Sequence, residues 1–101
     1  MKFRQYEKYA IKTVKKDYTA VFFALGLASK VGQVCDLIKK QQCNACDNSE
    51  SIKEILGDTL WYVTMLAQKT GSSLEEVAVE NLEVLADLCE EEAGQSKVSN
   101  D

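Results

Sequence analysis

The segment FALGLASKVGQVCDLIKK (residues 23–40) belongs to a predicted helix over residues 18–42, the most apolar part of the chain. Apolar side chains recur on it at helical spacing in two stripes. One stripe is Phe22, Leu25, Ala28, Cys35 and Ile38, and the other is Phe23, Leu27, Val31, Val34 and Leu37. A helix that is apolar over so much of its circumference is buried on more than one side. Because three short partner helices in one small chain cannot cover it fully, we expect a homodimer.

Two polar side chains interrupt the apolar pattern of this predicted helix. Lys30 and Gln33 stand three residues apart, on either side of Val31 and Gly32. Residues at i and i+3 share a helix face, so the lysine and the glutamine are neighbours. Their position on an otherwise apolar helix marks them as candidate site residues.

Three further helices are predicted outward from this one. The first covers residues 2–16, the third starts near Ser51 and ends at Gly71, and the fourth begins after Ser73. A capping box of Ser51 with Glu54 and a second one of Ser73 with Glu76 mark two helix starts, and glycine is typical just after a helix end. The pattern predicts an all-α fold with one domain over residues 1–92 and a disordered tail over residues 93–101.

The composition fits this fold class. Of 101 residues 46% are hydrophobic and 28% are charged, with 5 glycines and no proline, as is typical of a helical globular chain. The formal net charge of −4 argues against binding a nucleic-acid polymer, which needs a basic surface. We see no apolar run near the roughly 20 residues that span a bilayer, and the charged first ten residues do not resemble a signal peptide. A cytoplasmic protein without membrane contact is expected.

The four cysteines allow several interpretations. Cys43 and Cys46 form a C-x-x-C pair, and Cys35 and Cys89 lie on predicted helices. A structural zinc site needs four Cys or His ligands, and the chain has no histidine, so Cys35 and Cys89 would have to complete it. A redox C-x-x-C normally opens a helix after a strand, and no strand is predicted. We favour two loop thiols and two partly buried thiols without a metal.

Three segments together resemble a known family. They are FALGLASKVGQVCDLIKK (residues 23–40), KEILGDTLWYVTMLAQKTGSSLEEVA (residues 53–78) and VENLEVL (residues 79–85). In order and spacing they are similar to the MazG-like branch of the all-α nucleoside triphosphate pyrophosphohydrolases, over roughly residues 3–88. The resemblance implies four-helix subunits that pair into a dimeric helical bundle. It also implies cleavage of a nucleoside triphosphate to the monophosphate and pyrophosphate with Mg²⁺ or Mn²⁺.

The family motifs explain how such a site works. An E-x-x-E on one helix and an E-x-x-D on the next gather four carboxylates, the ligands that hard divalent cations prefer. A later N-x-x-K adds an amide and an ammonium for metal and phosphate. In this chain the E-x-x-E positions are Lys30 and Gln33, and the E-x-x-D positions are Ile55 and Asp58. The N-x-x-K positions are Asn81 and Val84.

Only Asp58 and Asn81 therefore keep the family's metal ligands. Lys30 puts a positive charge at a cation position, Gln33 offers a neutral oxygen, and Ile55 offers none. Val84 replaces the phosphate lysine. No residue is assigned as catalytic. We expect Lys30 to form an ion pair with Asp58 in place of a metal, with Gln33 and Asn81 completing a hydrogen-bonded network.

Other residues have two interpretations each. Asp36 is either a displaced metal ligand or a solvated carboxylate near Lys39 and Lys40, and Glu54 is either a displaced ligand or the capping-box partner of Ser51. We favour the structural role for both. A shift of one residue turns Glu54 about 100° away from the cluster, and Asp36 lies one turn too far along its helix.

The aromatic pair and the lysines leave similar alternatives. Trp61 and Tyr62 could stack on a nucleotide base, but at this helical spacing they are more often core or dimer-interface residues. Lys39, Lys40 and Lys53 could attract a phosphate, and a solvated face explains them equally well.

Three functions stay open at this point. The first is a pyrophosphohydrolase homologue with little or no activity, which keeps nucleotide binding or acts as a helical interaction module. The second is an active metal-dependent enzyme with a displaced ligand set of Asp58, Asn81 and either Asp36 or Glu54. The third is a subunit that pairs with an active homologue and supplies half of a shared site.

Overall fold

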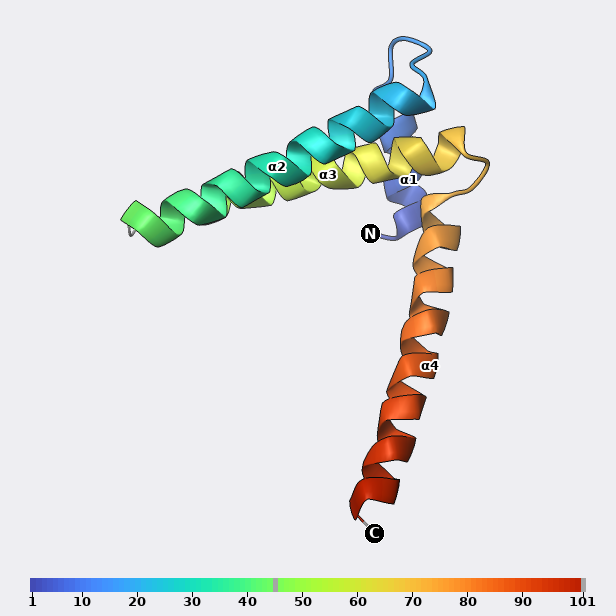
Figure 1. Ribbon diagram of the computed structural model, residues 1–101. Helices are drawn as coiled ribbons and strands as arrows, with labels where there is room; N and C mark the ends of the chain where they lie inside the picture. Colours follow the sequence, from blue (N-terminus) through green and yellow to red (C-terminus); the bar gives the residue numbers. More distant parts are fainter. Residues whose placement is uncertain (45, 101) are drawn as a thin grey trace.

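The structure is a computed structural model that describes residues 1–44 and 46–100, with side chains for residues 1–44 and 46–92. It contains four helices: α1 (Phe3–Lys12), α2 (Ala20–Asn44), α3 (Ser49–Lys69) and α4 (Leu74–Asn100) (Figure 1). Within these described ranges there is no strand. The predicted all-α class and the number of helices are confirmed.

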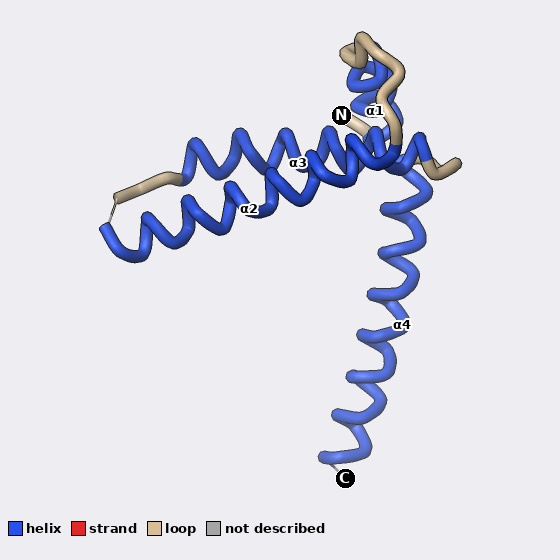
Figure 2. Tube along the Cα trace, turned by 45° about the horizontal axis from the view of Figure 1, so that its top comes forward, coloured by secondary structure: helices blue, strands red, loops and turns tan. Residues whose placement is uncertain are grey.

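The helices form an open, L-shaped molecule. Helices α2 and α3 run side by side as an antiparallel hairpin, α1 crosses one end of it, and α4 leaves this end as a separate arm (Figures 1 and 2). The molecule measures 58 × 42 × 27 Å, and the radius of gyration of its Cα atoms is 17.9 Å. A compact domain of this length has a radius of gyration of about 13 Å. Much of the helical surface is therefore left without a partner inside the chain.

The small core lies where α1, α2 and α3 meet. Its buried members are Ala10, Phe23 and Met65, and partly buried aromatic rings surround them. The ring of Phe23 meets the ring of Trp61 edge-on, at 5.7 Å between centroids. A Cβ at Gly26 would collide with the ring of Tyr62, so glycine is required for this close approach of α2 and α3.

Helix α1 ends earlier than the predicted residue 16. Thr13 is its C-terminal cap, and the Thr13 hydroxyl donates to the carbonyl of Ala10 at 2.7 Å. Beyond it, the Lys69 ammonium on α3 donates to the Asp17 carboxylate at 2.6 Å, which lowers the pKa of that carboxyl. These contacts favour a turn over a further helical turn at residues 13–16.

Helix α3 begins two residues before the predicted start. Asn48 occupies the N-cap position, and its side-chain amide donates to the backbone carbonyl of Leu37 on α2 at 3.0 Å. The predicted capping box of Ser51 with Glu54 is wrong, because both residues lie inside the helix. The Asn48 amide joins this start to α2, a contact between helices that local propensity does not reveal.

The α3–α4 connection is set by a glycine and by a carboxylate of α1. Gly71 has a φ of +84°, as expected for the residue after a helix end. The buried Glu7 carboxylate accepts the backbone N–H of Leu74 at 3.0 Å and the side-chain amide of Gln68 at 2.7 Å. The Ser73 hydroxyl accepts the N–H of Glu76 at 3.1 Å, which confirms the N-terminal half of the predicted capping box. Helix α1 thus holds the first turn of α4.

Two predictions concern the ends of helices and the membrane. The side chains of residues 93–100 and the whole of residue 101 lie outside the described part, so the disordered tail stays a prediction.

Helix α2 is long and apolar enough to cross a membrane by length and composition, with a mean hydropathy of 1.5. The expectation that no segment reaches this limit is wrong. The core helix of a soluble protein or a signal sequence can satisfy the same limits of length and hydropathy.

Candidate functional site

An ion pair joins α2 to α3 at the predicted site. The Lys30 ammonium lies 3.3 Å from a carboxylate oxygen of Asp58. The Lys30 side chain is 24% exposed and the Asp58 side chain is 54% exposed, so the pair lies at the edge of the helix interface. The prediction that Lys30 pairs with Asp58 is confirmed.

Tyr6, which packs against the core, senses the charge of Asp58 in a way that the sequence did not reveal. This partly buried residue of α1 has a phenol whose pKa is raised by burial and, to a smaller extent, by the negative charge of Asp58. The phenol therefore stays protonated at neutral pH. No motif marks Tyr6. Its place on the apolar side of the first helix was the only signal, and that signal predicts a core residue.

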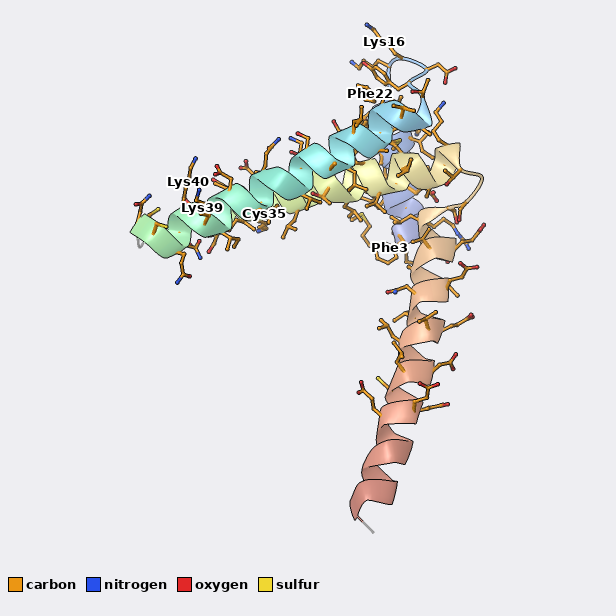
Figure 3. The ribbon with its side chains drawn as sticks, in the orientation of Figure 1. Phe3, Lys16, Phe22, Cys35, Lys39 and Lys40 are labelled. Carbon is orange, nitrogen blue, oxygen red and sulfur yellow. The ribbon has the colours of Figure 1, made fainter. Side chains whose placement is uncertain are left out.

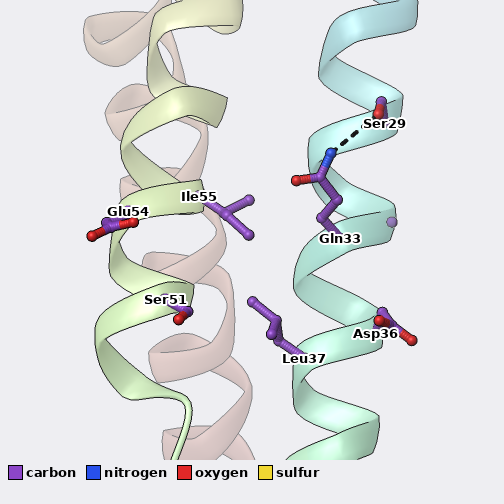
Figure 4. Close-up of a pocket in the computed structure, with 8 residues that line it drawn as sticks. Ser29, Gln33, Asp36, Leu37, Ser51, Glu54 and Ile55 are labelled. Carbon is purple, nitrogen blue, oxygen red and sulfur yellow. Dashed lines mark hydrogen bonds between the residues drawn. The ribbon is translucent and has the colours of Figure 1, made fainter.

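A groove opens beside the ion pair, between α2 and α3. Its volume is about 560 Å³ and it is lined by Ser29, Gly32, Gln33, Asp36, Leu37, Ser51, Glu54 and Ile55. Ile55 and Leu37 point toward each other between the two helices (Figure 4). The Gln33 amide donates to the Ser29 hydroxyl at 3.4 Å. Two of the substituted family positions, Gln33 and Ile55, thus line one groove.

The two carboxylates of the groove lie at its margins. The Asp36 carboxylate pairs with the Lys40 ammonium at 2.9 Å, which confirms the solvated role predicted for Asp36. The Glu54 side chain lies on the side of α3 that is turned away from Gln33 (Figure 4). The two carboxylates therefore do not converge on a common point in the groove.

These donors do not fit a magnesium or manganese ion. Among the described residues no three Asp, Glu, Cys or His side chains lie close enough to hold a metal. The one retained carboxylate, Asp58, already faces the Lys30 ammonium. Mg²⁺ prefers several oxygen ligands in near-octahedral order, and an amide and an isoleucine cannot replace two carboxylates.

Within one chain, the N-x-x-K positions do not reach the groove between α2 and α3. Asn81 and Val84 lie on α4, and over the described residues no Cα of α4 comes within 8 Å of a Cα of α2. Both residues are exposed. The predicted network of Gln33 with Asn81 is therefore not formed within one chain. Its absence follows from the direction of α4, which no local pattern encodes.

The aromatic pair belongs to the core. The rings of Trp61 and Tyr62 meet edge-on at 5.0 Å, and the Trp61 indole N–H donates to the Thr13 hydroxyl at 2.8 Å. Both pack against the Phe23 cluster. The core contacts predicted for these two residues are confirmed.

The lysines considered for phosphate binding and the four cysteines are exposed. Lys39 and Lys40 lie toward the far end of α2 (Figure 3), and Lys53 is exposed on α3. Cys35, Cys43, Cys46 and Cys89 are all free and exposed. The expectation that Cys35 and Cys89 are partly buried is wrong for the single chain, because no other helix covers their side of α2 or α4.

The comparisons with known proteins add no relative. No protein-family model, no curated protein and no solved structure matches the chain. The resemblance to the MazG-like pyrophosphohydrolases therefore depends on the motifs of the sequence alone.

Proposed function

We propose that this chain is a MazG-like nucleoside triphosphate pyrophosphohydrolase homologue with little or no hydrolytic activity. The observation that carries the proposal is the Lys30–Asp58 ion pair, with 3.3 Å between ammonium and carboxylate. In this proposal a fixed cation stands where the family places a divalent ion. The proposal rests on the resemblance of the motifs for its reaction class and on the geometry for the loss of activity.

Electrostatics supports the loss of metal binding. Two like unit charges 4 Å apart repel each other by about 1 kcal/mol in water and about 4 kcal/mol near a protein surface. The repulsion is doubled for a divalent ion beside the Lys30 ammonium. With one carboxylate, already paired, the site has too little negative charge to offset this cost.

The function that remains in this proposal is binding. The groove of about 560 Å³ has the size of a small-molecule site and combines apolar with polar side chains. A nucleotide or a helical segment of another protein is the proposed ligand, and the chain acts as a homodimer. The expected cellular place is still the cytoplasm.

One observation favours a second candidate, an active metal-dependent enzyme. Gln33, Asp36 and Glu54 all line one groove, so a rearrangement of side chains could add them to Asp58. Asn81 would then come from another subunit, either a second copy or an active homologue, because α4 does not reach α2 within the chain.

Pyrophosphate release separates the two candidates. The chain is incubated with a panel of ribo- and deoxyribonucleoside triphosphates and Mg²⁺ or Mn²⁺, and pyrophosphate is measured through a coupled pyrophosphatase. We expect no turnover above that of Asp58→Ala. Turnover that disappears in Asp58→Ala would overturn the proposal in favour of the active enzyme.

Restoring the family ligands tests the reason for inactivity. We expect the quadruple variant Lys30→Glu, Gln33→Glu, Ile55→Glu, Val84→Lys to bind Mn²⁺ in calorimetry, whereas the wild-type chain does not. A matched control makes the same three carboxylate changes at exposed positions off the groove, at Lys39, Gln42 and Leu56. Equal Mn²⁺ binding by both variants would show that added charge alone is responsible. That result, or Mn²⁺ binding by the wild-type chain, contradicts the proposed role of Lys30.

A further inference from the structure

Charged side chains are segregated toward the two ends of the chain. Six of the 12 basic residues lie within the first 16 positions, where Glu7 is the single acid and is buried. Eight of the 16 acidic residues lie on α4 from Glu75 to Glu92, a stretch without lysine or arginine. The formal net charge of −4 thus hides a strongly basic and a strongly acidic region. Net charge alone does not exclude an anionic partner for the basic region.

Basic side chains gather where α1 leads into α2. Lys12 is the last residue of α1, Lys15 and Lys16 lie in the loop that follows, and all three are exposed. Lys8 lies one turn back on α1 and is exposed as well. The loop stands away from the free ends of the α2–α3 hairpin and of α4 (Figures 1 and 2), and Lys16 points outward from it (Figure 3). The acidic α4 therefore runs away from this basic region.

Exposed apolar side chains lie beside these lysines. Val21, in the first turn of α2, is 66% exposed, and Phe22 is 41% exposed. The Phe22 ring stacks on the Tyr18 ring at 3.9 Å between centroids, and both rings meet the buried Phe23 ring edge-on. We give the name basic corner to Lys12, Lys15, Lys16, Tyr18, Val21 and Phe22. It combines positive charge with an aromatic stack that is anchored on the core.

The loop of the basic corner is held by contacts at both of its sides. Asp17, its one acid, pairs with Lys69 of α3 at 2.6 Å between carboxylate and ammonium. The Thr19 hydroxyl accepts the backbone N–H of Phe22 at 3.3 Å. Because Lys69 offsets the charge of Asp17, the corner stays positive. Because the loop is already bonded in place, a partner that binds it has little ordering to impose.

We infer that the basic corner binds the surface of an anionic lipid membrane. Lysines attract negatively charged headgroups without the fixed geometry that an arginine fork imposes. Exposed aromatic and aliphatic side chains enter the boundary between headgroups and acyl chains, whereas an acidic protein that paired with the lysines would leave Val21 in water. The cytoplasmic leaflet is anionic, so a peripheral contact agrees with the expected cytoplasmic place. It replaces the expectation that the chain has no membrane contact.

Sedimentation with vesicles tests the inference on the unchanged chain. We expect binding to vesicles of equal parts phosphatidylcholine and phosphatidylserine at about 0.1 M salt and its loss at about 1 M salt, because the screening length falls from about 10 Å to about 3 Å. We expect no binding to vesicles of phosphatidylcholine alone. Salt-insensitive binding to these neutral vesicles would assign the contact to the exposed apolar residues of α2 and overturn the inference.

Two adjacent pairs of exposed lysines give a matched comparison. Lys15→Glu with Lys16→Glu reverses charge at the corner, and Lys39→Glu with Lys40→Glu makes the same change toward the far end of α2 (Figure 3). Each basic residue near an anionic leaflet strengthens binding by about fivefold. We expect the first variant to bind anionic vesicles at least about 25-fold more weakly than the wild type, and the second to stay within about threefold of it. Equal losses would overturn the inference, because net charge would then explain them.

The apolar part of the corner has its own comparison. Val21 is 66% exposed, and Leu82 on α4 is 65% exposed. We expect Val21→Ser to weaken binding to anionic vesicles by about threefold or more, because the valine leaves water when it enters the membrane surface. Leu82→Ser is expected to leave binding unchanged. Equal binding by the two variants would contradict apolar contact at the corner.

Two further outcomes would assign the corner to another partner. Salt-sensitive binding of polyglutamate or duplex DNA, without binding of anionic vesicles, would assign it to an acidic polymer. Salt-sensitive self-association that is lost in the Lys15→Glu, Lys16→Glu variant, again without vesicle binding, would assign it to the acidic α4 of a second copy. Vesicle binding is measured without nucleotide, so it succeeds or fails independently of the proposed function.

Discussion

Lys30 changes the charge of the candidate site. Its ammonium lies 3.3 Å from a carboxylate oxygen of Asp58, at the position where the family that the motifs resemble carries a carboxylate. Because the two side chains are 24% and 54% exposed, the pair contributes only about 0–1 kcal/mol to folding. The main effect of this residue is therefore on the charge of the site and not on the stability of the protein.

Tyr6 reports on the same charge. Its pKa is raised from 10.0, first by burial and then by Asp58, so the unfolded chain loses the phenol proton at a lower pH than the folded one. This contribution to the free energy of unfolding is intact below pH 10.0 and is lost as the pH rises through the folded pKa. We expect Asp58→Asn to shift the Tyr6 titration to lower pH, measured by the near-ultraviolet absorbance of tyrosinate.

The controls for this titration lie in the same chain. Tyr6→Phe assigns the signal, and Tyr9→Phe removes a tyrosine of α1 that is 64% exposed. Asp36→Asn removes an exposed carboxylate that pairs with Lys40 and is expected to leave Tyr6 unchanged. An identical titration of Tyr6 in Asp58→Asn and the wild type would show that Asp58 does not face the phenol.

At the scale of the element, α4 depends on a carboxylate from another helix. The buried Glu7 accepts the first N–H of α4, at Leu74, and the amide of Gln68. Removing one partner of a buried hydrogen bond costs about 1–3 kcal/mol. We expect Glu7→Ala to lower the free energy of unfolding by this amount and to speed amide hydrogen exchange in the first turn of α4.

Glu75 offers the comparison for Glu7. It also joins α1 to α4, but its ion pair with Arg4 is exposed. We expect Glu75→Ala to change the free energy of unfolding by less than about 1 kcal/mol. If chemical denaturation gives equal losses for Glu7→Ala and Glu75→Ala, the buried carboxylate does not hold α4.

At the scale of the whole molecule, stability and assembly are linked. The core of one chain has few buried members, whereas much of α4 and several apolar residues of α2 are exposed, namely Val21, Leu25, Val31 and Ile38. If folding and pairing are coupled, the thermal midpoint rises with protein concentration, by about 5–8 °C for a hundred-fold increase. Calorimetry over this range tests it. We expect the midpoint of Val31→Glu to be lower and independent of concentration, and a constant wild-type midpoint would contradict the coupling.

Local pattern in the sequence was sufficient for the helices and for one contact of the site. Helical spacing of apolar residues predicted all four elements, and Gly71 marked the end of α3 because its positive φ favours glycine. The register of the motifs predicted the pair of Lys30 with Asp58. These features depend on neighbours within a turn or two of the chain, or on two helices that must pack side by side.

Tertiary structure decided the contacts that join the C-terminal end of α1 and the start of α3 to other helices, the direction of α4 and the surroundings of Asp58. Thr13 closes α1 and also binds Trp61, Asn48 starts α3 through a carbonyl of α2, and Glu7 holds α4 away from the groove. As a result Asn81 on α4 lies away from its expected partners on α2, and the pKa of Tyr6 on α1 is raised by burial and by the charge of Asp58. The physical reason is that each of these positions depends on a hydrogen bond or a charge from a distant part of the chain, which helical periodicity does not encode.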